Sequence, residues 1–314
     1  MKSLVLDADT ANTTGATLTE HLALLAMRIG ARATRPARHR GLSLYCRTLN
    51  RFLPERDITL RLANDALFSF PLGDPYWTRL LDPRSIYEPE VQAFLLAVAD
   101  VDYDFIDCGA NFGYWSVLVS SKRFGNHRAL AIEPSRGNYR RLCKNRRLNI
   151  DRFAALRRAV GHNDSRTGWL AGAKHEGLRL VEPESDGIGE EVEVVSLDGL
   201  AERGFLKFER PLIVKLDVEG MEIDAIRGST ACLHHDVALI CEDHSSDSTH
   251  RVSRCLLDEL GWQIYLFQPT DGTFSQLTDI AMLARCKAAS TGGYNVFAFN
   301  GPLWRSRMQQ RLVT

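Results

Sequence analysis

The sequence predicts an α/β fold built on an open, mostly parallel β-sheet with helices on both faces. From about residue 90, short apolar runs typical of buried strands alternate with segments of helical periodicity. The first of these strands runs into a glycine-containing turn at residues 109–113, the place where open parallel sheets bind ligands. An acid, Glu133, follows Gly113 by 20 residues and ends the next strand. Together these observations indicate a Rossmann-like domain that binds a nucleoside.

The composition is that of an ordinary globular protein with no bias toward a polyanionic partner. The chain has 314 residues, and its 39 Lys+Arg residues balance its 39 Asp+Glu residues, so no DNA partner is expected. Seven cysteines are scattered without a C-x-x-C pair, which is typical of a reducing compartment. The N-terminus lacks the pattern of a signal peptide, and no apolar run approaches the roughly 18 residues of a spanning helix. We therefore expect a cytoplasmic protein without a transmembrane segment.

Changes of pattern divide the chain into an N-terminal extension (1–87), a main domain (88–300) and a C-terminal tail (301–314). Residues 1 to about 17 are polar and aperiodic, and we expect them to be loosely ordered. For the rest of the extension, periodicity and turn residues predict helices over 18–33 and 42–52, a β-hairpin over 58–70 and an aromatic loop over 71–89.

Two features of the extension bear on function. Its loop carries Tyr76, Trp77 and Tyr87, which suit the cover of an active site, a sugar-binding face or ordinary packing. Its helical region is rich in arginine and poor in acids. These arginines form either a solvated face that pairs with acids elsewhere in the chain, or a docking patch for an anionic substrate carrier. The arginines are Arg28, Arg32, Arg35, Arg38, Arg40, Arg47, Arg51, Arg56 and Arg61.

The main domain alternates strands and helices in the rhythm of a parallel sheet. The apolar runs predict strands over residues 105–108, 128–132, 155–160, 212–216, 237–241, 263–267 and 295–299. The helical patterns cover residues 90–99, 114–122, 136–148, 221–231 and 249–260, with a short helix from an N-cap at Ser196 through Ala201. Residues 166–193 are less regular and predict a hairpin.

The turn after the first strand of this domain carries the clearest ligand-binding signal. Gly109 and Gly113 allow a sharp turn and the close approach of a ligand. Asn111 takes the place of the middle glycine of the dinucleotide pattern, and the G-x-G-x-x-G spacing of NAD-binding domains is absent. Asp107, just before the turn, repels a pyrophosphate but attracts an ammonium group such as that of a methionyl moiety.

Glu133 stands where nucleoside-binding folds place a carboxylate that accepts hydrogen bonds from ribose hydroxyl groups. Asp107 and Glu133 together therefore indicate a nucleoside ligand that lacks a pyrophosphate. An alternative stays open, in which the glycines only shape a turn and Glu133 caps the helix that follows.

Several segments in combination resemble the FkbM family of S-adenosylmethionine-dependent methyltransferases, over about residues 88 to 300. The resemblance implies a class I methyltransferase fold, Rossmann-like, with a seven-stranded sheet whose last strand is antiparallel. It also implies S-adenosyl-L-methionine as the cofactor and, commonly, O-methylation of a hydroxyl on a sugar, glycan or secondary metabolite. The segments are Phe105 to Gly113, Glu133-Pro134, Asn145 with Asn149, Val195 to Asp198, and Ile213 to Glu222 with Gly228.

The same resemblance assigns parts of the cofactor to residues of this chain. It gives the methionyl part to the turn, the ribose to Glu133, and the adenine edge to the end of the third strand. The cofactor-binding residues that it implies are Asp107, Gly109, Ala110, Asn111, Phe112, Gly113, Glu133, Ala159, Val160 and Asp217.

Candidate catalytic groups follow the fourth and fifth strands. Asp217 ends one strand, and Glu242 and His244 end the next, so the parallel sheet brings them to one edge. Methyl transfer requires alignment of the acceptor oxygen and exclusion of water, and a base helps to remove the proton of a hydroxyl acceptor. His244 is the first candidate for that base because imidazole titrates near neutral pH. Asp217 and Glu242 are orienting or alternative groups, and Lys215 is expected to pair with an acid.

Other interpretations of the same residues stay open. His244 is equally well described as a hydrogen-bonded loop histidine, and Asp217, Glu242 and His244 together could hold a divalent ion, although we expect no resident metal. An RNA methyltransferase recruited through the arginine-rich extension is an alternative, but the chain contains no recognisable RNA-binding module. A non-catalytic module that binds the nucleoside is another. The resemblance favours a small-molecule or glycan acceptor.

Overall fold

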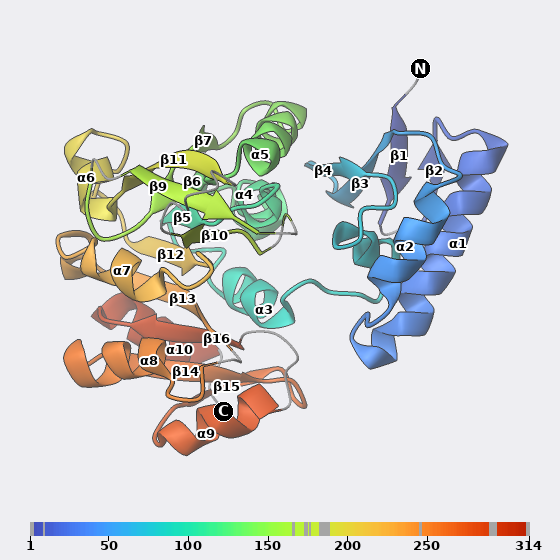
Figure 1. The fold of residues 1–314 in the computed structure, drawn as a ribbon. Coiled ribbons are helices and arrows are strands. Elements are labelled where there is room, and N and C mark those ends of the chain that lie inside the picture. Colours follow the sequence, from blue (N-terminus) through green and yellow to red (C-terminus); the bar gives the residue numbers. More distant parts are fainter. Residues whose placement is uncertain are drawn as a thin grey trace. The chain divides into compact units, whose positions relative to one another are not determined.

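The computed structural model of the chain describes residues 3–8, 10–164, 167–172, 175, 177–181, 189–244, 247–288 and 294–311. The chain forms two compact units, residues 1–89 with 144–151 (the N-terminal unit) and residues 90–143 with 152–314 (the main unit). Figure 1 shows their elements. Among the described residues, no helix is both long enough and apolar enough to cross a membrane.

The N-terminal unit contains a four-stranded sheet in the order β2-β1-β3-β4 (Figure 1). β3 and β4 form the predicted antiparallel hairpin, and β1 pairs in parallel with β3. The prediction of a loosely ordered start was therefore wrong. Leu4 and Leu6 are buried on one side of β1, and four residues are too few for their alternation to stand out in the sequence. The strands are β1 (Leu4–Asp7), β2 (Thr13–Thr14), β3 (Asp57–Ala63) and β4 (Ala66–Pro71).

Helices α1 (Leu18–Thr34) and α2 (Leu42–Asn50) of this unit match the two predicted helices. Thr17 begins α1 as its N-cap. The Thr17 side chain accepts a hydrogen bond from the Glu20 N–H, and the Glu20 carboxylate accepts one from the Thr17 N–H at 2.7 Å. This capping box satisfies N–H groups that a helix start leaves without partners. Glu20 also accepts a hydrogen bond from Arg56 at 2.5 Å.

The aromatic residues of the loop after β4 pack within the N-terminal unit. Trp77 is 1% exposed, and its ring lies 4.8 Å from that of Phe68 and 5.2 Å from that of Tyr87. The hydroxyl groups of Tyr76 and Tyr87 are 2.9 Å apart. Packing inside this unit therefore accounts for the aromatic character of the loop.

Two asparagines at the end of α5 (Arg136–Leu148) bind the backbone of β4. The Asn145 side chain accepts from the Ser69 N–H at 2.7 Å and donates to the Ser69 carbonyl at 3.1 Å. Asn149 does the same for Leu67, at 2.9 and 2.7 Å. Because β4 ends the sheet, these side chains supply the hydrogen bonds that a further strand would make.

The main unit contains an eight-stranded sheet in the order β15-β14-β16-β13-β12-β5-β6-β7 (Figure 1). β13, β12, β5, β6 and β7 are parallel to one another, and β16 is antiparallel to both of its neighbours. This is the class I methyltransferase arrangement, with β15 added at the edge of the expected seven strands. The strands are β5 (Asp104–Cys108), β6 (Arg128–Ile132), β7 (Ala154–Leu156), β12 (Leu212–Leu216), β13 (Val237–Asp243), β14 (Gln263–Gln268), β15 (Thr273–Gln276) and β16 (Tyr294–Phe299).

Helices connect these strands, mostly at the predicted places. Two differences from the sequence prediction concern the end of the chain, where α9 and α10 were not predicted. Trp304 and Met308 of α10 are each 1% exposed, so the expected tail is a packed helix. The helices are α3 (Pro89–Ala97), α4 (Tyr114–Val119), α5, α6 (Leu197–Glu202), α7 (Glu222–Arg227), α8 (Arg251–Arg254), α9 (Ile280–Ala288) and α10 (Pro302–Arg311).

The predicted strand over 155–160 is divided between two sheets. β7 belongs to the main sheet, whereas β8 (Ala159–Val160) pairs in parallel with β11 (Glu190–Val195) in a small sheet of order β10-β9-β11-β8. The polar residues Arg157 and Arg158 separate the two short strands and bind acids of β11. The irregular stretch forms the predicted antiparallel strands β9 (Thr167–Ala171) and β10 (Arg179–Val181).

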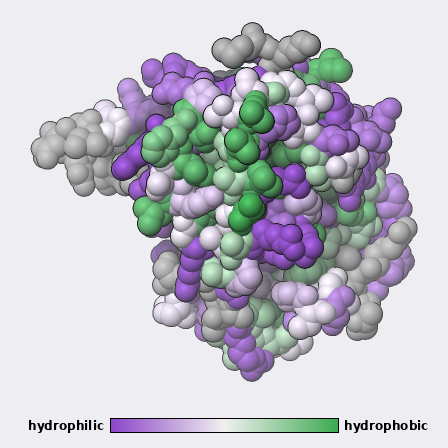
Figure 2. Space-filling view, turned by 90° about the vertical axis from the view of Figure 1, so that its right-hand side faces the viewer, coloured by the Kyte–Doolittle hydropathy of each residue, from purple (hydrophilic) through white to green (hydrophobic). Residues whose placement is uncertain are grey.

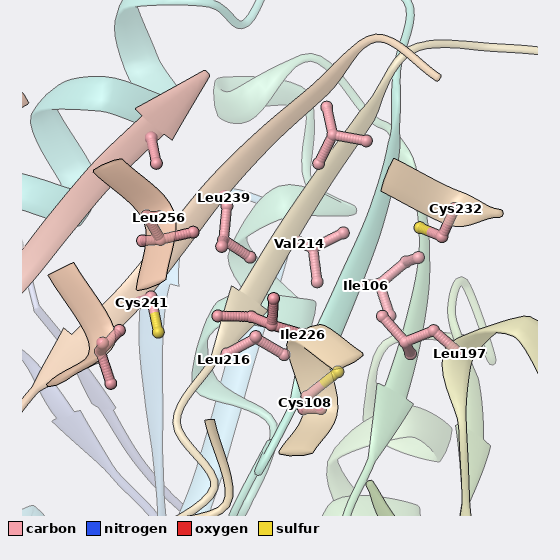
Figure 3. Packing of buried hydrophobic residues seen from close by; sticks show 14 of the residues in the cluster. Ile106, Cys108, Leu197, Val214, Leu216, Ile226, Cys232, Leu239, Cys241 and Leu256 are labelled. Atoms are coloured by element: carbon pink, nitrogen blue, oxygen red, sulfur yellow. The ribbon is translucent and has the colours of Figure 1, made fainter. Parts of the chain in front are cut away.

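The core of the main unit lies between the sheet and the helices that cover one of its faces (Figure 3). Side chains from neighbouring strands point into it and meet Ile226 of α7 and Leu256. Four of the seven cysteines, Cys108, Cys232, Cys241 and Cys255, are buried in this cluster, where they behave as small apolar residues. The strand residues that Figure 3 labels are Ile106, Cys108, Val214, Leu216, Leu239 and Cys241.

We expect Asn145→Ala to destabilise the protein by about 2–4 kcal/mol, because it removes the partners of the N–H and C=O groups of Ser69. The midpoint of urea unfolding measures the effect. Asn145→Asp, which keeps the acceptor for the Ser69 N–H but sets a buried carboxylate oxygen against the Ser69 carbonyl, should cost at least as much. Equal stability of Asn145→Ala and the wild-type protein would contradict this role.

Candidate functional site

Three strand ends of the main sheet meet at Gly109. The Gly109 and Ala110 N–H groups donate to the Ile132 carbonyl at the end of β6, at 2.9 and 3.0 Å, and the Asp217 N–H donates to the Cys108 carbonyl at 3.0 Å. A Cβ atom at Gly109 would lie 1.8 Å from the carbonyl oxygen of Asp217, and the φ angle of Gly109 is +82°. Glycine is therefore required here by both space and conformation.

The turn continues through two more residues with positive φ angles, Asn111 at +52° and Gly113 at +84°. Asparagine tolerates this region better than most residues, which explains why it stands at the middle glycine position. Its side-chain oxygen accepts from the Phe112 N–H at 2.9 Å and so holds the turn. A Cβ atom at Gly113 would lie 2.5 Å from Leu142 of α5.

Glu133 is 4% exposed and binds both sides of the site. One carboxylate oxygen accepts from the Asn111 N–H at 2.8 Å, and the other accepts from the Ser135 N–H at 2.9 Å and from Asn138 Nδ2 at 3.3 Å. Burial raises the pKa of Glu133 to about 8, against the opposing effect of these donors. Glu133 therefore shapes the turn and also caps the start of α5, as the structural interpretation of its position predicted.

Asp107 is 2% exposed at the end of β5, directly before the turn. Its carboxylate accepts a hydrogen bond from the Ser116 hydroxyl in α4 at 2.7 Å. Two buried carboxylates, Asp107 and Glu133, thus flank the same backbone turn. Their charges act on each other, since Asp107 contributes to the raised pKa of Glu133.

His175, which the sequence analysis did not single out, lies against the turn. Its ring stacks on that of Phe112, with centroids 4.9 Å apart and planes at 19°. Its carbonyl accepts from Asn111 Nδ2 at 3.2 Å and from Asn138 Nδ2 at 2.8 Å. No motif marks His175 in the sequence, because its contact with the turn depends on how the small sheet is placed.

Asp217, Lys215 and Glu242 form a network at the ends of β12 and β13, in which Lys215 is buried and the two acids are partly exposed. Lys215 is 2% exposed, and its Nζ lies 2.8 Å from Asp217 Oδ2, which confirms the expected pairing with an acid. Burial acts to raise the pKa of Asp217, but the charge and hydrogen bond of Lys215 outweigh it, so the pKa lies below its usual value. Burial and the charge of Asp217 raise the pKa of Glu242 to about 8. Asp217 thus stays ionised and shares a hydrogen bond with Glu242.

His244 lies between two carboxylates. Its Nε2 is 3.2 Å from Glu222 Oε1, and its Nδ1 is 3.8 Å from Glu242 Oε2. Glu222 is 2% exposed and also accepts from the Val218 and Gly220 N–H groups, at 3.3 and 3.1 Å. The hydrogen bond to Glu222 raises the pKa of His244 to about 9. The imidazole is therefore protonated at neutral pH.

The structure brings together most of the residues that the sequence placed in one site. Asp217 connects the turn at residues 109–113 with the network at the ends of β12 and β13. Its backbone lies against Gly109, and its side chain belongs to the network with Glu242. Glu222 ends one of the segments that carry the family resemblance, but its part as the partner of His244 was not foreseen. Ala159 and Val160 are buried in hydrophobic clusters, and their contact with a cofactor stays a prediction.

Metal coordination was considered for Asp217, Glu242 and His244. Over the described ranges, no group of three His, Cys, Asp or Glu side chains could hold a metal ion. These three residues are instead hydrogen-bonded or ion-paired with one another and with Lys215 and Glu222.

Comparison with protein families identifies the region that contains the site. The family model described as "Methyltransferase FkbM domain" matches residues 107–264, which include the turn, Glu133, Asp217, Glu242 and His244. No protein with curated annotation matches the chain.

Among solved structures, the chain is similar to a methyltransferase FkbM from Methylobacillus flagellatus KT, with 16% identity and a TM-score of 0.37. The similarity covers 69% of this chain and 56% of that one, so the chain spans little more than half the length of that protein. A precorrin-6y C5,15-methyltransferase from Geobacter metallireducens GS-15 has 13% identity, a TM-score of 0.38 and coverage of 69% and 91%. TYW2 of P. horikoshii, solved in complex with MeSAdo, has 12% identity, a TM-score of 0.36 and coverage of 85% and 83%.

We expect the pKa of His244 to be about 9 and to fall in Glu222→Gln, because the hydrogen bond to Glu222 is the largest cause of its elevation. An NMR titration of the imidazole carbon-bound protons measures both values, and the spectrum of His244→Gln assigns the resonance. An unchanged pKa in Glu222→Gln would show that other groups hold the proton.

Proposed function

This chain belongs to the FkbM methyltransferase family, and we propose that it transfers a methyl group from S-adenosyl-L-methionine to a hydroxyl group of a sugar, glycan or secondary metabolite. The observation that carries the proposal is the pair of buried carboxylates, Asp107 and Glu133, on either side of the glycine-containing turn. A third carboxylate, Asp217, touches the same turn through its backbone.

The chemistry of the donor set fits this cofactor. Glu133 offers about four acceptor sites on its two oxygens, and three of them accept hydrogen bonds from protein groups, so one site is left for a ribose hydroxyl group. Asp107 and Asp217 supply negative charge for an ammonium group and a sulfonium. A pyrophosphate, by contrast, would meet three carboxylates. When bound, the cofactor supplies an activated methyl group.

The residues of the chain then have two tasks, to align the acceptor oxygen with the methyl carbon and to take its proton. The turn at residues 109–113, with Asp107 and Glu133, would hold the cofactor, whose methyl carbon would pass to the acceptor oxygen while the sulfur would keep the electron pair of the carbon–sulfur bond. The hydroxyl proton passes to a base. The sulfur atom would be neutral after the transfer, so the site would lose one positive charge. A nearby carboxylate that takes up the hydroxyl proton would lose one negative charge, and the net charge of the site would stay the same.

The charge states of the network favour Glu242 as that base and make His244 a positioning group. His244, with a pKa raised to about 9, already holds a proton at neutral pH and cannot accept another. Glu242, with a pKa raised to about 8 by burial and Asp217, is a much stronger base than an ordinary carboxylate once it has ionised. Asp217, held ionised by Lys215, orients the carboxyl group of Glu242 through their hydrogen bond.

We expect Asp107→Ala and Glu133→Ala each to weaken binding of S-adenosylhomocysteine by roughly tenfold or more, because each removes a carboxyl group that forms hydrogen bonds with the ligand. His244→Ala should retain this affinity. Titration calorimetry measures the affinity of all three variants for S-adenosylhomocysteine, with NAD as the control ligand. Heat of binding with NAD but none with S-adenosylhomocysteine would exclude a methyltransferase of this kind.

The rate of methyl transfer should rise with pH and level off above about 8, because Glu242 must lose its proton before it can accept one from the substrate. Glu242→Gln should lower turnover by about 10²–10⁴-fold and abolish this pH dependence while retaining cofactor affinity. The rate can be followed with labelled cofactor, after a screen of hydroxylated acceptors. A normal pH profile in Glu242→Gln, together with loss of turnover in His244→Ala, would restore His244 as the base.

A further inference from the structure

Helix α1 of the N-terminal unit is apolar on two opposite sides. Ala23, Leu24, Met27 and Ala31 are buried in the unit. On the opposite side, Leu18, Leu22, Leu25 and Ile29 are 78%, 61%, 55% and 58% exposed. At 3.6 residues per turn, these four lie within an arc of about 60° and form one line along the helix.

This exposed line lies beside basic residues. Figure 2, which faces the side of the molecule where α1 lies, shows a band of hydrophobic side chains with hydrophilic ones around it. Arg28 and Arg32 flank the line on α1 itself, one turn apart. We refer to Leu18, Leu22, Leu25, Ile29, Arg28 and Arg32 as the α1 surface.

The segment that contains α1 and α2 is strongly positive. Residues 18–54 contain seven arginines and one acid, Glu20, which is buried in its ion pair with Arg56. Of the seven, Arg35 pairs with Asp82 at 3.1 Å, and the described residues include no acid within ion-pair distance of the other six. The second helix adds to the same character, since it exposes Leu44 beside Arg47.

We infer that the α1 surface binds the chain to the surface of an anionic lipid bilayer. An exposed line of leucine and isoleucine with flanking arginines is the chemistry of a helix that lies in a membrane interface. The apolar side chains enter the boundary between headgroups and acyl chains, and the arginines extend to the phosphates. Each arginine near the surface of an anionic leaflet contributes roughly 1 kcal/mol to the attraction, which corresponds to about a fivefold gain in affinity per arginine.

A bilayer fits these observations better than a second copy of the chain. Two copies would bring like charges together, and the repulsion opposes their association. The exposed line consists of four aliphatic side chains, whereas a stable protein interface buries roughly 800 Å² per partner. Binding to a lipid surface does not require a contact area of this size, because the attraction of the arginines to the lipid phosphates adds to the contribution of the apolar side chains.

Co-sedimentation of the full chain with vesicles tests this inference, and it does not depend on the proposed enzymatic function. We expect the protein to bind vesicles in which a third of the lipid is phosphatidylglycerol, and to bind vesicles of phosphatidylcholine alone at least tenfold more weakly. Added salt should weaken binding to the anionic vesicles, because the arginine contribution is screened.

Two variants separate the apolar from the electrostatic contribution. The Leu22→Glu/Leu25→Glu and Arg28→Glu/Arg32→Glu double variants should each reduce the vesicle partition coefficient by roughly tenfold or more, and the second should also reduce its dependence on salt. Phe205→Glu, which changes an apolar residue that is 52% exposed in the main unit, is the matched control and should bind normally. All of these side chains are at least partly exposed, so folding should be retained, and circular dichroism checks this.

Failure of the wild-type protein to bind anionic vesicles would overturn the inference. So would equal binding by the Leu22→Glu/Leu25→Glu variant. A dimer in light scattering that this variant abolishes, without vesicle binding, would instead assign the α1 surface to contact between two copies.

Discussion

The contact between Gly109 and the carbonyl of Asp217 is the constraint on which the site of the main unit depends. Because Gly109 has no Cβ atom, the backbone at the end of β12 lies in direct contact with the backbone of the turn after β5. The same turn is fixed to β6 by two hydrogen bonds to Ile132. Residues far apart in the sequence thereby become neighbours. A larger residue at position 109 would separate the turn at residues 109–113 from the acids at the ends of β12 and β13.

Burial of charge is the second theme of the site, and it acts differently on each acid. Glu133 and Glu242 are desolvated strongly enough that their pKa values rise to about 8. Asp217 is also desolvated, although its side chain is 24% exposed, and Lys215 holds its pKa below the usual value. His244 gains its proton from the same surroundings, through Glu222. Keeping carboxyl groups neutral by burial reduces stability less than burying them charged.

In the N-terminal unit, side chains and helices cover the open edge and the faces of a small sheet. Its edge strand β4 receives hydrogen bonds from Asn145 and Asn149, side chains that imitate the backbone of a neighbouring strand. Its aromatic loop closes over the hairpin with Trp77 in the interior. Helix α1 covers the unit with one side and leaves the other exposed. The residues that resembled a family motif in the sequence thus include two whose role here is structural.

The sequence by itself determined the class of fold, the glycine-containing turn and most strands and helices of the main unit, because these depend on local periodicity and on glycine conformation. Helix 136–148 and strands 128–132 and 212–216 were predicted with the bounds that the structure has. Only the tertiary structure decided the charge of His244, the contact of His175 with Phe112, the division of strand 155–160 and the pairing of β1. Those features depend on which distant groups become neighbours and how much water they lose, and neither is written in a local pattern.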